Sequence, residues 1–110
     1  MPTSDEPLFE FAKLVVTGEI NEITRILTLN SSLAVVPASV GAMRDRAADY
    51  FITEIARHLY AGDTALHVAA AAFRRPVAEL LLARGADCRA ANRRGAQPLH
   101  YAADANHWNP

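Results

Sequence analysis

The stretch that decides the fold is Gly62-Asp63-Thr64-Ala65-Leu66-His67, because its pattern returns 33 residues later as Gly95-Ala96-Gln97-Pro98-Leu99-His100. An alanine-rich segment follows each copy, Val68-Ala69-Ala70 after the first and Tyr101-Ala102-Ala103 after the second. A fixed period of this length is typical of repeat proteins, in which each unit buries its apolar face against the next unit. The sequence therefore predicts an array of similar units.

Each copy also carries the local signals of a helix that begins in the turn. Thr64 can cap a helix that starts at Ala65, since its hydroxyl accepts a hydrogen bond from an otherwise unpaired backbone N–H. Pro98 stands where a first-turn proline is tolerated. The run Leu80 to Leu82 predicts a second, thicker helix, which Gly85 can end in the left-handed conformation. These signals predict a helix-turn-helix unit.

This arrangement resembles the ankyrin repeat, whose unit is a turn, two antiparallel helices and a projecting loop. The resemblance implies an all-α fold, an ankyrin-type α-solenoid of stacked helix-turn-helix repeats with projecting loops. It also implies that His67 and His100 are buried, neutral and structural, each ring forming a hydrogen bond with the turn of the adjacent repeat. The expected structural positions are Thr64, His67, Gly85, Gly95 and His100.

A degenerate copy precedes the two clear ones. Leu8, Phe11, Ala12 and Val15 recur at the spacing of one helix face, and residues 18–28 resemble the second helix of a repeat. This unit lacks the turn motif, as terminal repeats often do when their outer face meets water. The chain is thus interpreted as about two and a half repeats.

An insertion separates the degenerate unit from the rest. Its first part contains Pro37 and Gly41 and is expected to be a loop. Its second part places apolar residues at helical spacing, which predicts a helix from about Arg44 to Tyr60. The predicted organisation is a single domain, residues 1–110, with a degenerate repeat (1–29), the insertion (30–61), a full repeat (62–94) and a truncated repeat (95–110).

The last unit has its turn and first helix but no second helix. The apolar face of Leu99, Tyr101 and Ala102 then lacks a partner on one side. Because about three repeats are needed for a stable stack, we expect the chain to be the N-terminal part of a longer array, with further ankyrin repeats after Pro110. A sharp, monomeric thermal transition of these residues in circular dichroism would contradict that expectation.

The composition limits the classes of partner. The net charge is −1, which gives no electrostatic reason to expect nucleic acid or an anionic membrane. The N-terminus lacks the features of a secretory signal, and the apolar stretches are far shorter than the ~20 residues of a membrane span. A single cysteine fits a reducing compartment. We therefore expect a cytoplasmic protein.

The sequence offers little for catalysis or metal binding. Cys88, His100 and His107 are 12 and 7 residues apart, which matches no short-loop zinc spacing. Inert packing of Cys88 as a small hydrophobic residue is favoured over a reactive thiol. There is no phosphate loop, no dinucleotide glycine run and no His-Glu-x-x-His motif. We expect no catalytic residues, no metal, no cofactor and no small-molecule substrate.

Three arginines are the best candidates for contact with a partner protein. Arg89, Arg93 and Arg94 lie in the loop between the last two units, which the resemblance places at a projecting finger. Exposed arginines pair with carboxylates and are enriched at interface hot spots, although ordinary solvation is the alternative for each. We predict a scaffold for protein–protein interaction that uses its concave face and fingers. The partner-binding positions are Tyr60, Ala61, Asp63, Ala71, Ala72, Arg89, Arg93, Arg94, Ala96, Asp104 and Ala105.

The competing hypothesis is that the stack is the N-terminal targeting arm of a larger enzyme whose catalytic part lies beyond Pro110. Further ankyrin units after that residue would favour the scaffold, and a new composition with clustered His, Asp or Cys would favour the enzyme.

Overall fold

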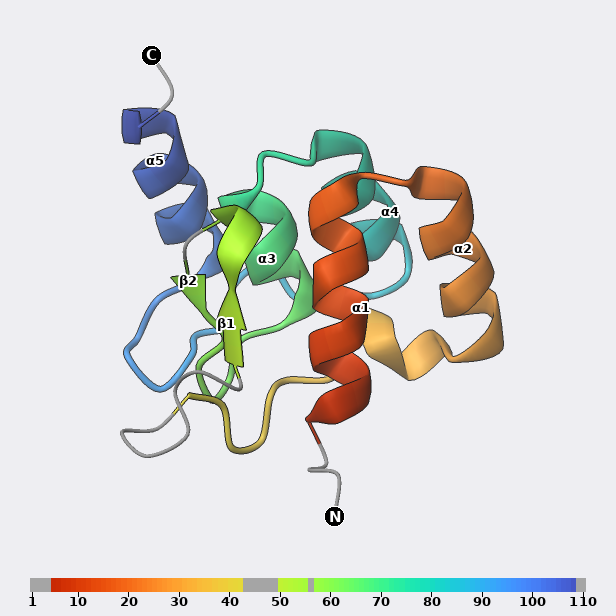
Figure 1. Cartoon of the computed structure of the whole chain (residues 1–110), viewed down its shortest axis with the longest axis horizontal. Helices are drawn as coiled ribbons and strands as arrows, with labels where there is room; N and C mark the ends of the chain where they lie inside the picture. Colours follow the sequence, from red (N-terminus) through yellow and green to blue (C-terminus); the bar gives the residue numbers. More distant parts are fainter. Residues whose placement is uncertain (1–4, 43–49, 56, 109–110) are drawn as a thin grey trace.

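The computed structural model describes residues 5–42, 50–55 and 57–108, with side chains as far as Ala103. The prediction of a helical protein is confirmed for most of this part of the chain (Figure 1). The elements are the helices α1 (Glu6–Thr17), α2 (Ile20–Leu29), α3 (Ala65–Ala71), α4 (Arg75–Ala83) and α5 (Pro98–Trp108), the 3-10 turns η1 (Ser31–Ala34) and η3 (Thr53–Ile55), and the strands β1 (Phe51–Ile52) and β2 (Arg57–His58).

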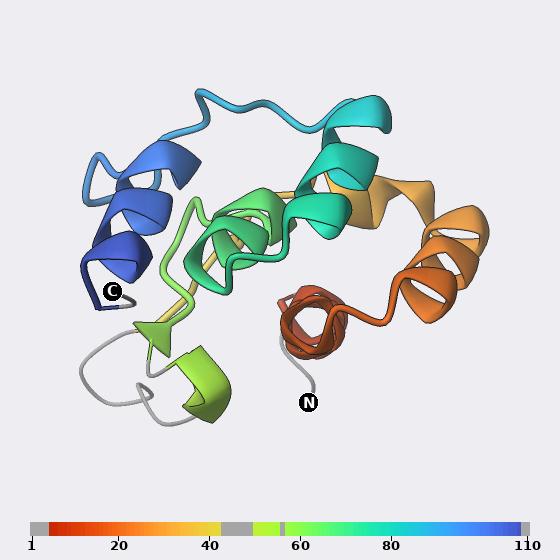
Figure 2. The same ribbon diagram turned by 90° about the horizontal axis from the view of Figure 1, so that it is seen from above.

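The helices form consecutive pairs, α1 with α2 and α3 with α4. Helix α3 is central, because it packs against α1 on one side and against α5 on the other. Figure 2 shows α2 and α4 on one side of this row and the strands on the opposite side of α1 and α3. The molecule therefore has a row of first helices between an outer pair of helices and the inserted segment.

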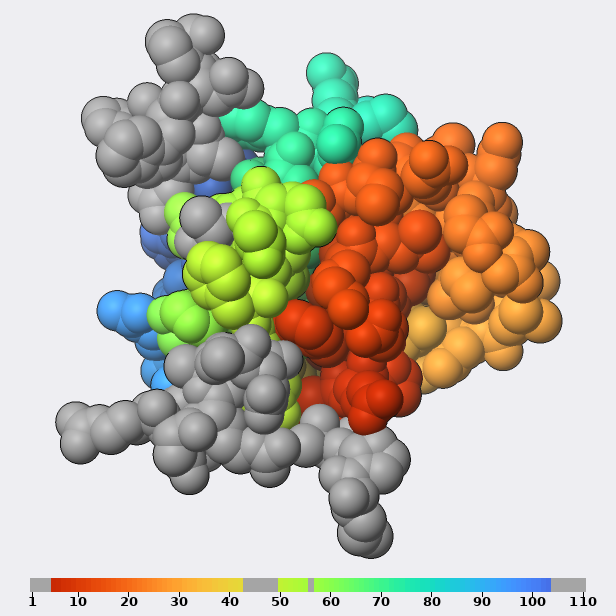
Figure 3. All heavy atoms as spheres, viewed as in Figure 1, coloured from red at the N-terminus to blue at the C-terminus, as the bar shows by residue number. Residues whose placement is uncertain are grey.

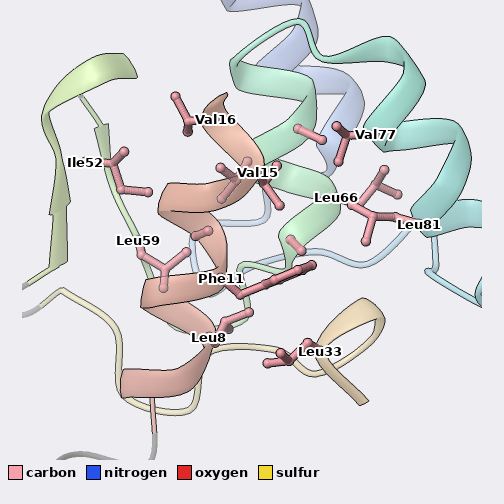
Figure 4. Packing of buried hydrophobic residues seen from close by; sticks show 14 of the residues in the cluster. Leu8, Phe11, Val15, Val16, Leu33, Ile52, Leu59, Leu66, Val77 and Leu81 are labelled. Atoms are coloured by element: carbon pink, nitrogen blue, oxygen red, sulfur yellow. The ribbon is translucent and has the colours of Figure 1, made fainter. Parts of the chain in front are cut away.

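One hydrophobic core joins α1, α2, α3 and α4 to the inserted segment, including η1 (Figure 4). The predicted face of α1 is confirmed, since Leu8, Phe11, Ala12 and Val15 are all buried. The predicted ends of the helices are also confirmed, because Gly85 follows α4 with a left-handed φ of 97° and Pro98 begins α5.

Arg74, in the turn between α3 and α4, ties the second helix pair to the first. Its Nε donates to the carbonyl of Val16 over 2.7 Å, at the C-terminal end of α1. The last carbonyls of a helix have no partner within the helix and carry partial negative charge, so a guanidinium there is stabilising. Next to it, Gly18 has a φ of 74°, and a Cβ there would lie 3.1 Å from Arg74 Cδ. Arg74 thus has a structural contact within the chain.

The predicted helix from Arg44 to Tyr60 is wrong over its described part. Residues 50–60 instead contain a two-stranded antiparallel pair, with Phe51 opposite His58 and Ile52 opposite Arg57. Tertiary packing overrides the helical spacing, because Ile52 and Leu59 are buried in the core on this geometry while Phe51 is exposed. Residues 43–49 and Ala56 lie outside the described part of the chain. The expected loop over 30–42 contains one regular piece, η1.

The two arms of the insertion are joined by backbone hydrogen bonds near its base. Ala38 N–H donates to Asp63 O over 2.8 Å, Gly62 N–H donates to Ala38 O over 2.8 Å, and Gly41 bridges to Tyr60. A Cβ on Gly41 would lie 2.1 Å from the backbone nitrogen of Ala61, so this close approach requires glycine.

Asp5, which precedes α1, binds residues 39–41 in the first part of the insertion. Its buried carboxylate accepts hydrogen bonds from the backbone N–H groups of Ser39, Val40 and Gly41 over 2.6–2.9 Å and from Tyr50 Oη over 3.1 Å. Burial alone would raise the pKa of Asp5, but these backbone donors outweigh it and the pKa is lowered. A buried anion therefore fixes the N-terminus of α1 to the insertion.

Candidate partner-binding site

The first turn is locked by His67, which is completely buried. Its Nδ1 accepts a hydrogen bond from the Thr64 backbone N–H over 3.0 Å. The proton of the neutral ring is then on Nε2, which donates to the carbonyl of Ala96 over 3.0 Å. This bond reaches the next turn along the chain, which is the kind of contact that the resemblance implies for His67.

Asp63 forms a second bridge in the same turn. One carboxylate oxygen accepts from the Tyr60 N–H and the other from Asn92 Nδ2, both over 2.9 Å, and Tyr101 Oη lies 3.2 Å from each oxygen. Burial raises the pKa of Asp63, against the opposing effect of these hydrogen bonds. Burial and the adjacent carboxylate also raise the pKa of Tyr101. Asp63 therefore joins the insertion, the last finger and α5.

A pocket of about 370 Å³ opens above this network. Its walls come from β2 and the end of the insertion, from the finger that precedes α5, and from the first turn of α5. The residues lining it are Arg57, His58, Tyr60, Asn92, Arg94, Ala96 and Tyr101.

Aromatic rings hold the guanidinium groups around the pocket. Cζ of Arg94 lies 5.2 Å and Cζ of Arg93 5.6 Å from the centre of the Tyr60 ring, and Cζ of Arg57 lies 4.7 Å from the centre of the Tyr101 ring. Each contact is within the range of a cation–π interaction. Arg93 also donates through Nη2 to the carbonyl of Ala42 over 2.8 Å. The geometry gives a basic surface whose side chains are oriented before any ligand binds.

The structure brings together only some of the predicted partner-binding residues. Tyr60, Arg94 and Ala96 line the pocket. Arg93 is exposed beside it, and Ala61 and Ala72 are partly exposed. Arg89 is exposed but is not among the residues that line the pocket. Asp104 and Ala105 lie beyond the described side chains.

Two of the predicted contact residues are interior. Asp63 is 1% exposed and Ala71 is 8% exposed, so neither offers a surface to a partner in this structure. Asp63 is occupied by the bridge described above.

The strands β1 and β2 cover part of the side of α1 and α3 that faces away from the outer helices (Figure 2). Figure 3 shows the described residues of the second part of the insertion, 50–55 and 57–60, in yellow-green on the surface beside α1.

Two further predictions need correction. His100 is exposed rather than buried, and among the described residues its ring is bonded only to the Gln97 N–H, over 2.9 Å. In the described part of the chain, no backbone carbonyl bonds to His100 as the Ala96 carbonyl bonds to His67. Cys88 is exposed rather than packed, because Ala86 takes the position against the core after α4 ends.

Sequence reasoning missed Arg57, His58 and Asn92 as parts of the site. The first two fall within the predicted helix from Arg44 to Tyr60, whose described part is a strand pair, so the sequence did not predict that they lie near Tyr101. A signal for strand was present in Tyr50-Phe51-Ile52-Thr53, a run of aromatic and β-branched residues. Asn92 had no signal beyond its place in a turn.

The described residues offer no other obvious chemistry. No group of three metal-ligating side chains lies together among them. Nor does any helix in that part of the chain have the length and apolar character needed to cross a membrane.

Paired helices, connected by a bridging turn and a finger, define a helical-repeat protein. The chain belongs to the ankyrin repeat family, because residues 37–109 match the family model described as ankyrin repeats (3 copies). The resemblance inferred from the two turns is therefore confirmed. The match includes the second part of the insertion and begins after α1 and α2, so the assignment of residues 1–29 to a degenerate repeat stays a prediction. A comparison with curated proteins gives no match.

Proposed function

We propose that this ankyrin domain binds a partner protein through the surface formed by Tyr60, Arg93 and Arg94. Ankyrin repeats are in general protein-interaction modules. The observation that carries the proposal is the pair of adjacent arginines, both exposed and both stacked on one tyrosine at the mouth of a pocket. Arginine and tyrosine are the residue types most enriched at interface hot spots.

The prediction gave the partner two contact surfaces, the concave face and the fingers, and the proposal gives the fingers the larger share. The row of first helices is partly covered by the insertion, so the concave face contributes less than in an uninterrupted stack (Figure 2). Ala61, Ala72 and Ala96 remain accessible positions near its edge. We propose a stacked, solenoid-type scaffold that presents its finger side to the partner.

Affinity capture with a matched control tests this proposal. The chain is immobilised and incubated with an extract of the cells that produce it, and retained proteins are quantified by mass spectrometry. Arg93→Glu with Arg94→Glu is expected to lose the specific partner while keeping the helical circular dichroism. Arg75→Glu with Arg84→Glu makes the same change of charge at the two ends of α4 and is expected to keep it.

Retention by both double variants would place the contact surface elsewhere. Arg89→Glu, tested alone, decides whether the surface extends to the third predicted arginine. Weaker capture by that variant would extend the site along the loop, and unchanged capture would confine it to the pocket side.

A further inference from the structure

Two exposed guanidinium groups, those of Arg93 and Arg94, lie beside the Tyr60 ring at the pocket. Arg94 uses Nη1 for one hydrogen bond, to Tyr60 Oη over 3.2 Å. Among the described side chains, no carboxylate lies within ion-pair distance of Arg93 or Arg94. Asp63 is bonded to residues at the base of the pocket, but it is 1% exposed and its oxygens face Asn92, Tyr101 and a backbone N–H. The accessible chemistry at Arg93 and Arg94 is therefore that of cationic hydrogen-bond donors.

The aromatic contacts decide which anion fits best. The rings of Tyr60 and Tyr101 have guanidinium groups over them, at 5.2 Å for Arg94 and 4.7 Å for Arg57. A nucleic-acid base needs an open aromatic face for stacking, and a guanidinium group already lies over each of these rings. A planar guanidinium fixed by a ring, as at Arg94, can meet a planar carboxylate with two parallel hydrogen bonds along its outer edge. The geometry favours a carboxylate over a base.

Orientation before binding also lowers the entropic cost of association. An arginine in solution loses rotamer freedom when it binds, whereas Arg94 is already held by a ring and a hydroxyl of Tyr60. Tyr60 itself is fixed through its N–H to Asp63. The position of the donors is therefore set by the buried network beneath them.

We infer that this pocket binds a glutamate or aspartate side chain in an acidic segment of the partner protein. The inference rests on the proposed function and specifies its partner chemistry. Arg94 is the main ligand, with Tyr60 and His58 at the rim. The volume of about 370 Å³ suits one or two side chains rather than a folded element.

Fluorescence anisotropy with labelled synthetic peptides tests this inference on the full chain. The probe is a ten-residue peptide of glutamate, glycine and serine, and the matched control replaces each glutamate by glutamine. We expect the glutamate peptide to bind and the glutamine peptide not to. Arg94→Glu should weaken binding at least about tenfold, since charge reversal at a close pair costs more than the ~1.4 kcal/mol that a factor of ten represents.

Arg84→Glu is the matched control for charge, because Arg84 is also exposed and lies at the end of α4. It should change the affinity less than about twofold, as expected for a distant charge that salt screens. Arg94→Gln, which removes the charge and nearly keeps the length, replaces Arg94→Glu if the reversed charge disturbs the circular dichroism. Equal binding of the two peptides, or equal loss with Arg84→Glu and Arg94→Glu, would overturn the inference.

A phosphoserine peptide of the same length provides the remaining arm. Binding of that peptide without binding of the glutamate peptide would overturn the carboxylate assignment in favour of phosphate. Failure of the inference is distinguishable from failure of the proposed function. If Arg93→Glu with Arg94→Glu abolishes partner capture while no acidic peptide binds, the function stands and the pocket chemistry assigned here is wrong.

Discussion

The two turns, Gly62–His67 and Gly95–His100, share a sequence pattern but lie in opposite surroundings. Leu66 in the first turn is 4% exposed, whereas Leu99 at the matching position of the second is 73% exposed. His67 is buried and reaches the next turn, whereas His100 is exposed and is bonded within its own turn. The pattern therefore specifies how a helix begins, and the residues packed around the turn determine whether it is buried.

The two turns also differ in whether their polar groups are paired within the chain or exposed. The polar groups of the first turn are paired with the finger and helix that follow it, through His67 to Ala96 and through Asp63 to Asn92 and Tyr101. The exposed arginines lie on the finger of the second turn. The first turn thus builds the support, and we propose that the partner binds the surface around the second turn.

The largest expected difference between the turns comes from removing each histidine. His67→Ala would leave a cavity and unpair the Thr64 N–H and one bond of the Ala96 carbonyl, at a cost of about 4 kcal/mol in the free energy of unfolding. His100→Ala removes one exposed hydrogen bond and should cost less than about 1 kcal/mol. Urea unfolding followed by circular dichroism measures both. Similar losses for the two variants would show that the turns are equivalent in solution, contrary to the comparison.

A smaller difference is expected from the two turn glycines. Both have positive φ, 87° at Gly62 and 79° at Gly95, so alanine is strained at either position. A Cβ on Gly62 would lie 2.7 Å from the Cα of Asn92, whereas a Cβ on Gly95 would meet nothing within 4 Å. Gly62→Ala should cost about 3 kcal/mol, because overpacking adds to the strain, and Gly95→Ala about 1 kcal/mol.

The same urea series checks the glycine pair, and the peptide assay extends it. Displacement of the finger backbone at Asn92 moves the support of Arg94, so Gly62→Ala should also weaken binding of the glutamate peptide. A stable Gly62→Ala variant with unchanged peptide affinity would show that the finger is not positioned by this contact.

The fold was predictable where a local pattern and its tertiary role agree. The period between the two turns, the first-turn Pro98, the left-handed Gly85 and the apolar face of α1 are all found in the structure. The insertion was not predictable in this way. Its apolar residues fit a helix by spacing, but burial of Ile52 and Leu59 is achieved by a strand pair. A short amphipathic stretch carries no information on the surface that will cover it.

The candidate site was predictable only in part for the same reason. Tyr60, Arg93 and Arg94 follow from their place on the fingers, but Arg57 and His58, which also line the pocket, come from the misassigned insertion. Asp63 illustrates the limit of a positional rule. A charged residue at a usually variable surface position is here buried, because Asn92 and Tyr101 supply the donors that its carboxylate needs.

Amide hydrogen exchange of the chain, alone and with its captured partner, tests most directly whether the partner contacts the surface around the second turn. We predict that the partner slows exchange over residues 57–60 and 92–96, while α3, which is already protected by the core, exchanges at the same rate in both states. Slower exchange over α2 and α4, with 57–60 and 92–96 unchanged, would contradict the account.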